Sequence, residues 1–517
     1  MSDIVLSTLN AKYIHAAFGL RYLLANMGAL RERTCLLEFD INHRPTDIAE
    51  VLLARNPRII GLGVYIWNVS LTIELVATLK RLQPGLVIVL GGPEVSYETE
   101  SQPVVQLADY VITGEADLKF GEVCGLVLEG ARPTNKIIHA ELPEFSQLTL
   151  PYELYSDHDL AHRVVYVEAS RGCPFTCEFC LSSLDIPVRQ VPLPQLVEQL
   201  TRLLGRGLKR FKFVDRTFNL NAQVSRSLLE FCLEHYQPGL FFHFEMVPDR
   251  LPESLREIIA RFPPGALQLE VGVQTFNEQV GTLIQRRQNY ARLEENCRFL
   301  RSQTGVHLHT DLIAGLPGET LESFAAGFDR LVALGPHEIQ VGILKRLRGT
   351  SIARHDAEWQ MVYNPNPPYE ILRNKLLDFP TVQRLRRFAR YWDLVGNSGN
   401  FVATTPLLWS GLAAGSKSPF HAFLRWSDWL HQRARRTDGI ALPRLMGFLL
   451  EYLTAQLKLE SKVVAEALWR DYKRGGRKDK PSLLRAFLPA DERKPQPSLA
   501  AGLKRQARHG AQGSDHV

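Results

Sequence analysis

Apolar residues in the first 140 positions alternate between two patterns. Short runs of branched and other apolar residues occur at 3–9, 34–40, 58–66, 86–92 and 110–114. Between them, stretches with helical spacing of apolar residues lie at 16–28, 46–56 and 71–83. Short apolar runs separated by amphipathic segments indicate βαβ units. The pattern therefore predicts a doubly wound, Rossmann-like parallel sheet over residues 1–140.

The middle of the chain, about 150–365, repeats this alternation with six further units. The expected strands lie at 163–170, 210–215, 241–247, 267–273, 307–313 and 338–344. Six βα units in series predict a TIM-type (β/α)6 barrel, closed or partial. The site of such a barrel lies at the carboxyl ends of its strands.

After the proline-rich stretch 364–368 the periodicity becomes helical only. Amphipathic helices need a surface to pack against, so residues 366–485 are predicted to form a helical domain on the barrel. The tail 486–517 has too few apolar residues for a core, and we expect it to be disordered.

Length and composition agree with several domains of an α/β protein. The chain has 517 residues, 45% of them hydrophobic and 22% charged, which is too long for a single core. It begins with a strand pattern, and no apolar run approaches the roughly 20 residues of a membrane span. We expect a cytoplasmic protein without a membrane partner.

The net charge of +6 depends largely on basic stretches near the C-terminal end, at 473–480 and 503–510. Charge runs of this kind are more typical of a solvated segment than of a nucleic-acid site. We therefore expect a small-molecule substrate and not a nucleic acid.

Three cysteines, Cys173, Cys177 and Cys180, form the pattern CxxxCxxC. Three thiolates on one loop can each hold one iron of a cubane cluster and leave the fourth iron open. A zinc site would need a fourth ligand and usually pairs its ligands two and two. A disulfide framework fits neither the seven cysteines of this chain nor the expected compartment. The other four, which we interpret as buried small hydrophobes, are Cys35, Cys124, Cys232 and Cys297.

The cysteine pattern, with the aromatic Phe179 before its last cysteine, resembles the radical S-adenosylmethionine (SAM) superfamily. The resemblance implies a 4Fe-4S cluster whose open iron binds the amino and carboxylate groups of SAM. It also implies reductive cleavage of SAM to a 5'-deoxyadenosyl radical, with electrons from a donor such as flavodoxin or ferredoxin.

Polar residues recur at the later strand ends of the predicted barrel. By the same resemblance, Glu245, Gln274, Arg286 and Asp311 are expected to bind SAM, and the neighbouring Arg287 leaves the choice of arginine open. SAM offers a ribose diol, an amino group and a carboxylate. These need acceptors, a carboxylate and a guanidinium respectively.

In the first domain, no G-x-G-x-x-G follows the first strand, whereas Gly91 and Gly92 follow a later one. The arrangement resembles the cobalamin-binding domain that precedes many radical SAM enzymes, and it implies that both glycines approach cobalamin. The motif D-x-H-x-x-G, whose histidine would bind cobalt, is absent. His15 on the first loop therefore either packs at the start of a helix or binds cobalt. A Rossmann-like domain without a cofactor is the alternative for the whole domain.

Residues 367–401 resemble an uncharacterised domain that follows the barrel in one cobalamin-type subgroup of radical SAM proteins. The basic residues Lys345, Arg346 and Arg348 at the barrel's end either line a pocket for an anionic substrate or are solvated.

The sequence predicts a radical SAM enzyme with a 4Fe-4S cluster, SAM and cobalamin. It would act on an unactivated carbon, with methyl transfer as one outcome. A transfer-RNA methylthiotransferase is an alternative, although that class needs three more cysteines in its first domain, where this chain has only Cys35 and Cys124. A cobalamin- or SAM-binding sensor without turnover is another.

Overall fold

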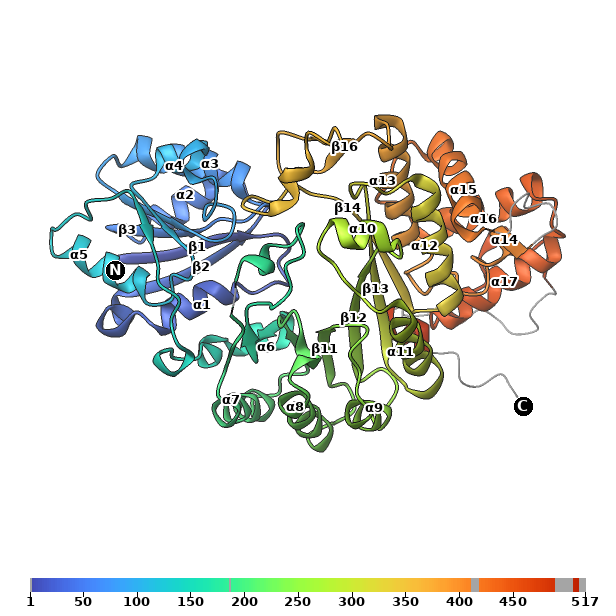
Figure 1. The fold of residues 1–517 in the computed structure, drawn as a ribbon, viewed down its shortest axis with the longest axis horizontal. Helices are drawn as coiled ribbons and strands as arrows, with labels where there is room; N and C mark the ends of the chain where they lie inside the picture. The colour runs from blue at the N-terminus through green and yellow to red at the C-terminus, as the bar shows by residue number, and fades with distance from the viewer. Residues whose placement is uncertain (1, 186, 411–417, 489–504, 511–517) are drawn as a thin grey trace.

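The computed structural model describes residues 2–185, 187–410, 418–488 and 505–510. Its first domain is a six-stranded parallel sheet in the order β2-β1-β3-β4-β5-β6 (Figure 1). The strands are β1 (Ile4–Asn10), β2 (Thr34–Asp40), β3 (Ile59–Gly63), β4 (Val87–Gly91), β5 (Tyr110–Thr113) and β6 (Ile137–His139). The first five confirm the sequence prediction, and the short β6 was not predicted.

Helices cover both faces of this sheet. One face packs against α1 (Phe18–Ala25) and α5 (Lys119–Leu128). The other packs against α2 (Pro45–Leu53), α3 (Val69–Leu82) and α4 (Pro103–Leu107). The doubly wound Rossmann-like architecture is confirmed, and ligands of such sheets bind at the carboxyl ends of the strands.

The second sheet is also parallel and has the order β14-β13-β12-β11-β10-β7. Its strands are β7 (Val165–Val167), β10 (Arg210–Phe213), β11 (Phe241–Met246), β12 (Leu267–Gln274), β13 (His307–Ala314) and β14 (Glu338–Ile343). Among the described residues, β7 and β14 do not pair, so the barrel is partial. The (β/α)6 prediction is confirmed.

Helices cover the outside of this partial barrel (Figure 1). They are α7 (Leu193–Gly205), α8 (Ala222–Glu234), α9 (Glu253–Ala260), α11 (Tyr290–Gln303) and α12 (Leu321–Leu334). The short helix α10 (Glu278–Leu283) lies at the carboxyl ends of the strands (Figure 1). The helix α6 (Asp157–His162) precedes β7, and the short strands β8 (Ser170–Arg171) and β9 (Arg189–Gln190) flank the cysteine loop.

The C-terminal region is helical, as predicted, and shares one core with the barrel. Two short strands, β15 (Val362–Tyr363) and β16 (Ile371–Arg373), lead into it. Its helices are α13 (Phe379–Leu394), α14 (Leu407–Ser410), α15 (Pro419–Ala434), α16 (Leu442–Glu451) and α17 (Ser461–Arg474). Aromatic rings of α12, α13 and α15 pack together at this junction, for example Phe328 edge to face against Trp392, with ring centroids 4.7 Å apart.

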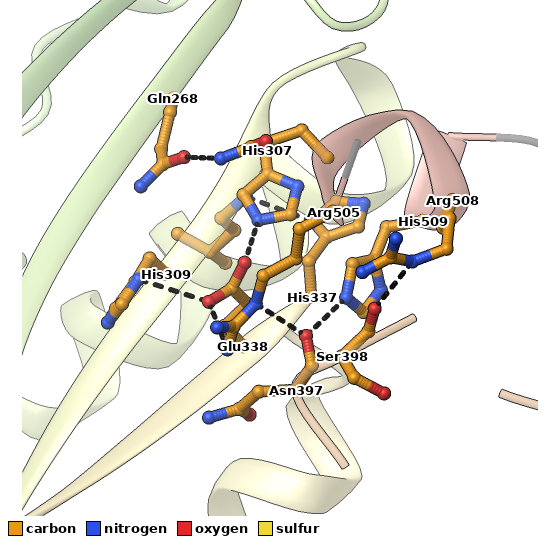
Figure 2. Close-up of polar contacts among 12 residues, drawn as sticks. Gln268, His307, His309, His337, Glu338, Asn397, Ser398, Arg505, Arg508 and His509 are labelled. Carbon is orange, nitrogen blue, oxygen red and sulfur yellow. Dashed lines mark hydrogen bonds and ion pairs between the residues drawn. The ribbon is translucent and has the colours of Figure 1, made fainter. Parts of the chain in front are cut away.

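One part of the predicted disordered tail 486–517 is ordered. Residues Arg505–Gly510 form α18, which packs against β13 at the amino-terminal end of the barrel (Figure 2). Arg505 lies 2.7 Å from the buried carboxylate of Glu338 and 2.8 Å from Asp393. For these six residues the disorder prediction is wrong, because a buried carboxylate needs a cationic partner. Tail residues 489–504 and 511–517 lie outside the described residues.

Within the described ranges, none of the helices combines the length and apolar content needed to cross a bilayer. The predicted boundaries at 140, 150, 365 and 485 remain predictions.

Candidate functional site

The cysteine loop opens onto a cavity of about 240 Å3 at the carboxyl ends of the barrel strands. Cys173, Cys177 and Cys180 all line this cavity, which we call the cysteine cavity, and none of them forms a disulfide. Burial raises the pKa of the Cys173 thiol, and the two neighbouring thiols add to the effect. Three free thiols lining one cavity are the donor set that a cubane cluster with one open iron requires.

The start of the loop is held by Asp215, at the end of β10. Its carboxylate accepts hydrogen bonds from the backbone N–H of Ala169 at 2.9 Å and the hydroxyl of Ser170 at 2.6 Å. Complete burial raises the pKa of Asp215 to about 7. Gly172 has φ +98°, and a Cβ there would lie 2.8 Å from the carbonyl oxygen of Asp185. Only glycine fits this turn without a shift of the backbone.

The middle of the loop is held by Glu178, which sequence reasoning missed. Its buried carboxylate lies 2.6 Å from His355 Nε2 and 2.5 Å from Arg354. Both partners lie in the 3-10 helix η7 (Ser351–His355). The partner His355 is 177 residues further along the chain, so no local spacing could reveal the pair. The contact ties the loop to the segment that follows the barrel.

The four residues expected to bind SAM, and the aromatic Phe179 of the cysteine pattern, line the same cavity as the cysteines: Phe179, Glu245, Gln274, Arg286 and Asp311. Arg286 donates to Cys177 Sγ at 3.5 Å and to the carbonyl of Gly272, and its Nε is buried without a partner. Glu245 pairs with Arg216 at 3.0 Å. Arg287 also lines the cavity, so the choice of arginine stays open. The site roles of all these residues remain predictions.

A polar seam, which the sequence analysis missed, continues from Asp311 into the barrel. Its members are His243, Glu270 and His309, with Glu270 bonded to His243 at 2.9 Å and Asp311 lying 3.2 Å from His309. Burial raises the pKa of Asp311, and the neighbouring His309 partly offsets this rise. Burial also acts to raise the pKa of Glu270, but His243, His309 and Lys212 together lower it to about 2. A sequence signal for this seam was available. Polar residues alternate with apolar ones in 241–247 and 307–313, and alternate residues of a strand lie on one face.

A second cavity, of about 260 Å3, lies at the carboxyl ends of β3, β4 and β5, between α1 and α5. We call it the glycine cavity, because six glycines line it: Gly19, Gly61, Gly63, Gly91, Gly92 and Gly114. Apolar and aromatic side chains such as Phe18, Tyr65 and Phe120 complete the wall. Missing side chains at several strand ends create a cradle that added Cβ atoms would narrow.

The two glycines selected from the sequence differ. A Cβ on Gly92, which has φ +108°, would lie 2.5 Å from the carbonyl oxygen of Val64. Gly92 is therefore required by the backbone itself. A Cβ on Gly91 would meet only the carbonyl of Ile112, at 3.6 Å, so Gly91 leaves space that a ligand can use.

Residues only two positions apart in the chain line the two cavities. Arg171 lines the glycine cavity and Cys173 lines the cysteine cavity. The Arg171 guanidinium pairs with Glu115 at 2.6 Å and Asp117 at 3.1 Å from the first domain, and with Glu168 at 2.7 Å. This cluster of charges fixes the cysteine loop to the strand ends of the first sheet.

His15 lines neither cavity. Its Nδ1 lies 2.5 Å from the Tyr166 hydroxyl, and its backbone bridges to Val164. Burial, with the charges of Lys12 and Lys212, lowers the pKa of His15. The contacts are those of a packing residue between the first domain and β7.

Two of the three basic residues after β14 join domains. Arg348 pairs with Glu94 at 2.9 Å and Glu98 at 3.1 Å, and Arg346 with Glu98 at 3.2 Å. Lys345 has no ion pair among the described residues, and it lines a different cavity.

Family models match three consecutive parts of the chain. Residues 4–123 match the B12 binding domain, and residues 167–331 match the radical SAM superfamily. Residues 357–509 match a protein family of unknown function, DUF4080. The three matches follow the order of the three structural regions.

Curated relatives include an uncharacterized methyltransferase of Pyrococcus horikoshii, 25% identical over 54% of this chain and 65% of the relative. A tRNA-2-methylthio-N(6)-dimethylallyladenosine synthase of Chloroflexus aurantiacus is 26% identical over 43% of this chain and 50% of the relative. The cobalamin-dependent radical SAM methyltransferase TokK of Streptomyces tokunonensis is 23% identical over 56% and 47%. The chain thus spans about half to two thirds of these relatives' length.

Among solved structures, the cobalamin-dependent SAM radical enzyme OxsB with aqua-cobalamin and SAM bound has a TM-score of 0.60 at 12% identity. The match covers 91% of this chain and 83% of that one. The radical SAM methyltransferase TsrM from Kitasatospora setae, with cobalamin and a [4Fe-4S] cluster bound, has a TM-score of 0.56 at 19% identity over 71% and 82%. At these identities the likeness shows a shared fold.

Proposed function

The chain is a radical SAM protein with an N-terminal B12 binding domain, and we propose that it is a cobalamin-dependent methyltransferase acting on an unactivated carbon of a small molecule. One observation carries the proposal. Arg171 lines the cavity that suits cobalamin, and Cys173, two positions later in the chain, lines the cavity that suits the cluster. Two cofactors held there would face one reaction centre.

The residues present fit the cofactor set of 4Fe-4S cluster, SAM and cobalamin. Cys173, Cys177 and Cys180 would hold the cluster and leave one iron open for SAM. The glycine cavity offers an apolar cradle at the carboxyl edge of a doubly wound sheet, where such folds bind ligands. When bound, the cluster with SAM supplies radical chemistry, and cobalamin supplies a methyl group.

The protein's own residues bind and orient. Arg286, next to Cys177, offers a guanidinium to a carboxylate, and Asp311 and Glu245 offer acceptors for an amino group or a ribose diol. Glu178 and Asp215 fix the loop from two sides. An electron donor such as flavodoxin or ferredoxin would have to supply the reducing electron.

A tRNA methylthiotransferase is a weaker candidate, although one relative carries that name. The chain has only Cys35 and Cys124 in its first domain. They lie in different elements, β2 and α5, and burial raises the pKa of Cys124 to about 12. Two cysteines in separate elements are one fewer than the three that such a class needs in its first domain.

The test is anaerobic reconstitution of the full chain with iron, sulfide and methylcobalamin, followed by incubation with reductant and methyl-labelled SAM. We expect 5'-deoxyadenosine, methionine or S-adenosylhomocysteine to appear. A reconstituted protein that binds cluster and cobalamin but forms none of these products would contradict the enzyme and favour a sensor.

A further inference from the structure

A third cavity, of about 1060 Å3, lies between the barrel and the C-terminal helical region. We call it the β14–α13 groove. One wall is the edge strand β14 from Gln340 to Ile343, and the other is the helix α13. Figure 1 shows α13 alongside β14. The helix α13 belongs to the part of the chain that matches a family of unknown function. Because α13 forms one wall of the groove, this part of the chain contributes to a candidate site.

The groove contains cations without partners. Lys345, Arg387 and Arg390 line it, and none of the three forms an ion pair within the part of the chain that the structure describes. The Nε atom of Arg387 is buried and has no hydrogen-bond partner. Buried donors without partners are costly and rare in folded proteins. Together, the three unpaired cations of the groove favour an anionic ligand.

The carboxylates of the groove offset this charge only in part. Glu370 pairs with Arg386 at 3.3 Å, and Asp393 pairs with Arg505 at 2.8 Å. Asp438 is the remaining acidic residue of the lining, and it is exposed. The unpaired charge of the groove is therefore positive.

The strand wall adds backbone groups. The side chain of Asn397 bonds both the N–H and the C=O of Ile339, at 2.8 and 2.9 Å, on the outer edge of β14. Alternate residues of a strand direct their peptide groups to the same side. The peptide groups of Val341 and Ile343 therefore point toward the groove, where they can orient a polar ligand.

The inner end of the groove reaches the reaction centre. Phe179, beside Cys180, lines both the groove and the cysteine cavity. Ile313 lines the groove two residues after Asp311, which lines the cysteine cavity. A ligand lying along the groove can thus have one end at the SAM site and the other among the arginines of α13.

We propose that the β14–α13 groove is the substrate site, and that the substrate carries a phosphate or carboxylate group bound by Lys345, Arg387 and Arg390. The assignment rests on the proposed function, since it names the substrate class of the same reaction centre. Guanidinium groups bind both kinds of oxyanion by charge-assisted hydrogen bonds.

The experiment is isothermal titration of the full-length, cluster-reconstituted protein with sodium pyrophosphate and, separately, with sodium citrate at constant ionic strength. The variants are Arg387→Gln/Arg390→Gln, Lys345→Gln and Arg387→Lys. Arg373→Gln is the matched control, because Arg373 is exposed and lies outside the groove. Iron content and SAM affinity are measured on the same samples.

We expect saturable binding of at least one probe, weakened about tenfold or more by the double substitution, because charged hydrogen bonds are lost. Lys345→Gln should weaken it less, Arg387→Lys should retain part of it, and Arg373→Gln should leave it unchanged. Preference for pyrophosphate would assign a phosphate-bearing substrate, and preference for citrate a carboxylate.

The groove assignment would be overturned if neither probe binds. It would also be overturned if wild type, the double variant and Lys345→Gln bind the probe with equal affinity. Lys345→Gln keeps the test valid if the double variant does not fold, since Lys345 has no ion pair to lose among the described residues. Probe binding without SAM binding would refute the proposed function and leave the anion site standing. SAM binding without probe binding would refute the anion site and leave the proposed function standing.

Discussion

The cysteine cavity and the glycine cavity have similar volumes, about 240 and 260 Å3, but they are built in opposite ways. The first is defined by side chains that are present: three thiols, Arg286 and Asp311 converge on it. The second is defined by side chains that are missing at the strand ends of a sheet. Chemistry that must ligate or hydrogen-bond needs specific groups, whereas a cradle for a large cofactor needs space.

The difference predicts how each cavity can be damaged. Substitutions that remove groups should affect the cysteine cavity alone, and substitutions that add atoms should affect the glycine cavity alone. The Arg171 cluster between them belongs to both and does not separate their functions.

The largest effect is expected when a thiol is removed. Cys173→Ala, Cys177→Ala or Cys180→Ala should lose iron and sulfide together, because three ligands are the minimum for a cluster with one open iron. Cobalamin retention should remain at the wild-type level. Iron and sulfide analysis with visible spectra checks this.

Cys232→Ala is the matched control, since Cys232 is buried in α8 and burial raises the pKa of its thiol. Equal cluster loss in Cys232→Ala would contradict the ligand assignment.

The second effect comes from adding atoms to the glycine cavity. Gly91→Val should abolish cobalamin retention by steric block while iron content and SAM binding persist. The backbone tolerates a Cβ at this position, whose nearest contact would be 3.6 Å. Cobalamin content after gel filtration is the measurement.

Gly85→Val provides the control, because a Cβ added to Gly85 would meet no atom within 4 Å and this glycine lies outside the cavity. Gly92 is unsuitable for this purpose, since any side chain there collides with Val64. Wild-type cobalamin content in Gly91→Val would show that the cofactor lies elsewhere.

A smaller effect is expected at the SAM residues. Asp311→Ala and Gln274→Ala should keep the cluster and weaken SAM binding by about 1–3 kcal/mol, because each removes one hydrogen-bond partner of a partly buried polar ligand. Equilibrium dialysis with SAM measures this. If both variants bind SAM as wild type does, the strand-end assignment is wrong.

The support of the cysteine loop should depend on pH. The folded-state pKa of Asp215, about 7, exceeds the value of 3.8 for a free aspartate, so folded protein holds this proton more tightly than unfolded protein. The stabilising contribution is present below about pH 4 and is lost as pH rises to about 7. Asp215→Asn should therefore gain stability relative to wild type over this range, by up to about 1.4 kcal/mol per pH unit.

Thermal unfolding of both proteins between pH 4 and 7.5 would show the trend as a diverging midpoint. A difference that is constant with pH would mean that Asp215 is ionised throughout.

The smallest effect is expected at His15. His15→Ala should retain cobalamin, because His15 bonds Tyr166 and lines neither cavity. Electron paramagnetic resonance of the cob(II)alamin form is the check. Nitrogen superhyperfine splitting that disappears in His15→Ala would identify His15 as a cobalt ligand.

The contrast between the cavities also explains what the sequence could predict. CxxxCxxC and the polar strand ends resemble those of radical SAM proteins, so the proposed SAM residues could be named by that resemblance. The structure places them in one cavity. The sequence signal for the glycine cavity was weaker. Gly91 and Gly92 were selected as a pair, but an added Cβ at Gly92 would collide with the backbone of Val64, whereas one at Gly91 would not collide with any atom.

Long-range pairs were beyond sequence reasoning. Glu178 meets His355, and Glu338 meets Arg505 of α18, through contacts that no spacing reveals. Because the contact between Glu338 and Arg505 could not be foreseen, the whole polar tail was predicted to be disordered (Figure 2). Likewise, Lys345, Arg346 and Arg348 look alike in the sequence. In the structure, Arg346 and Arg348 pair with glutamates of the first domain, whereas Lys345 lines the groove.

The central claim, that both cavities hold cofactors at one reaction centre, is tested most directly by electron paramagnetic resonance of the fully reconstituted protein. We predict about four iron atoms and about one cobalamin per chain. The cob(II)alamin signal should broaden when the cluster is reduced and stay sharp in Cys177→Ala. Wild-type protein that binds the cluster but never retains cobalamin, or whose cob(II)alamin signal is unaffected by reduction of the cluster, would contradict the claim.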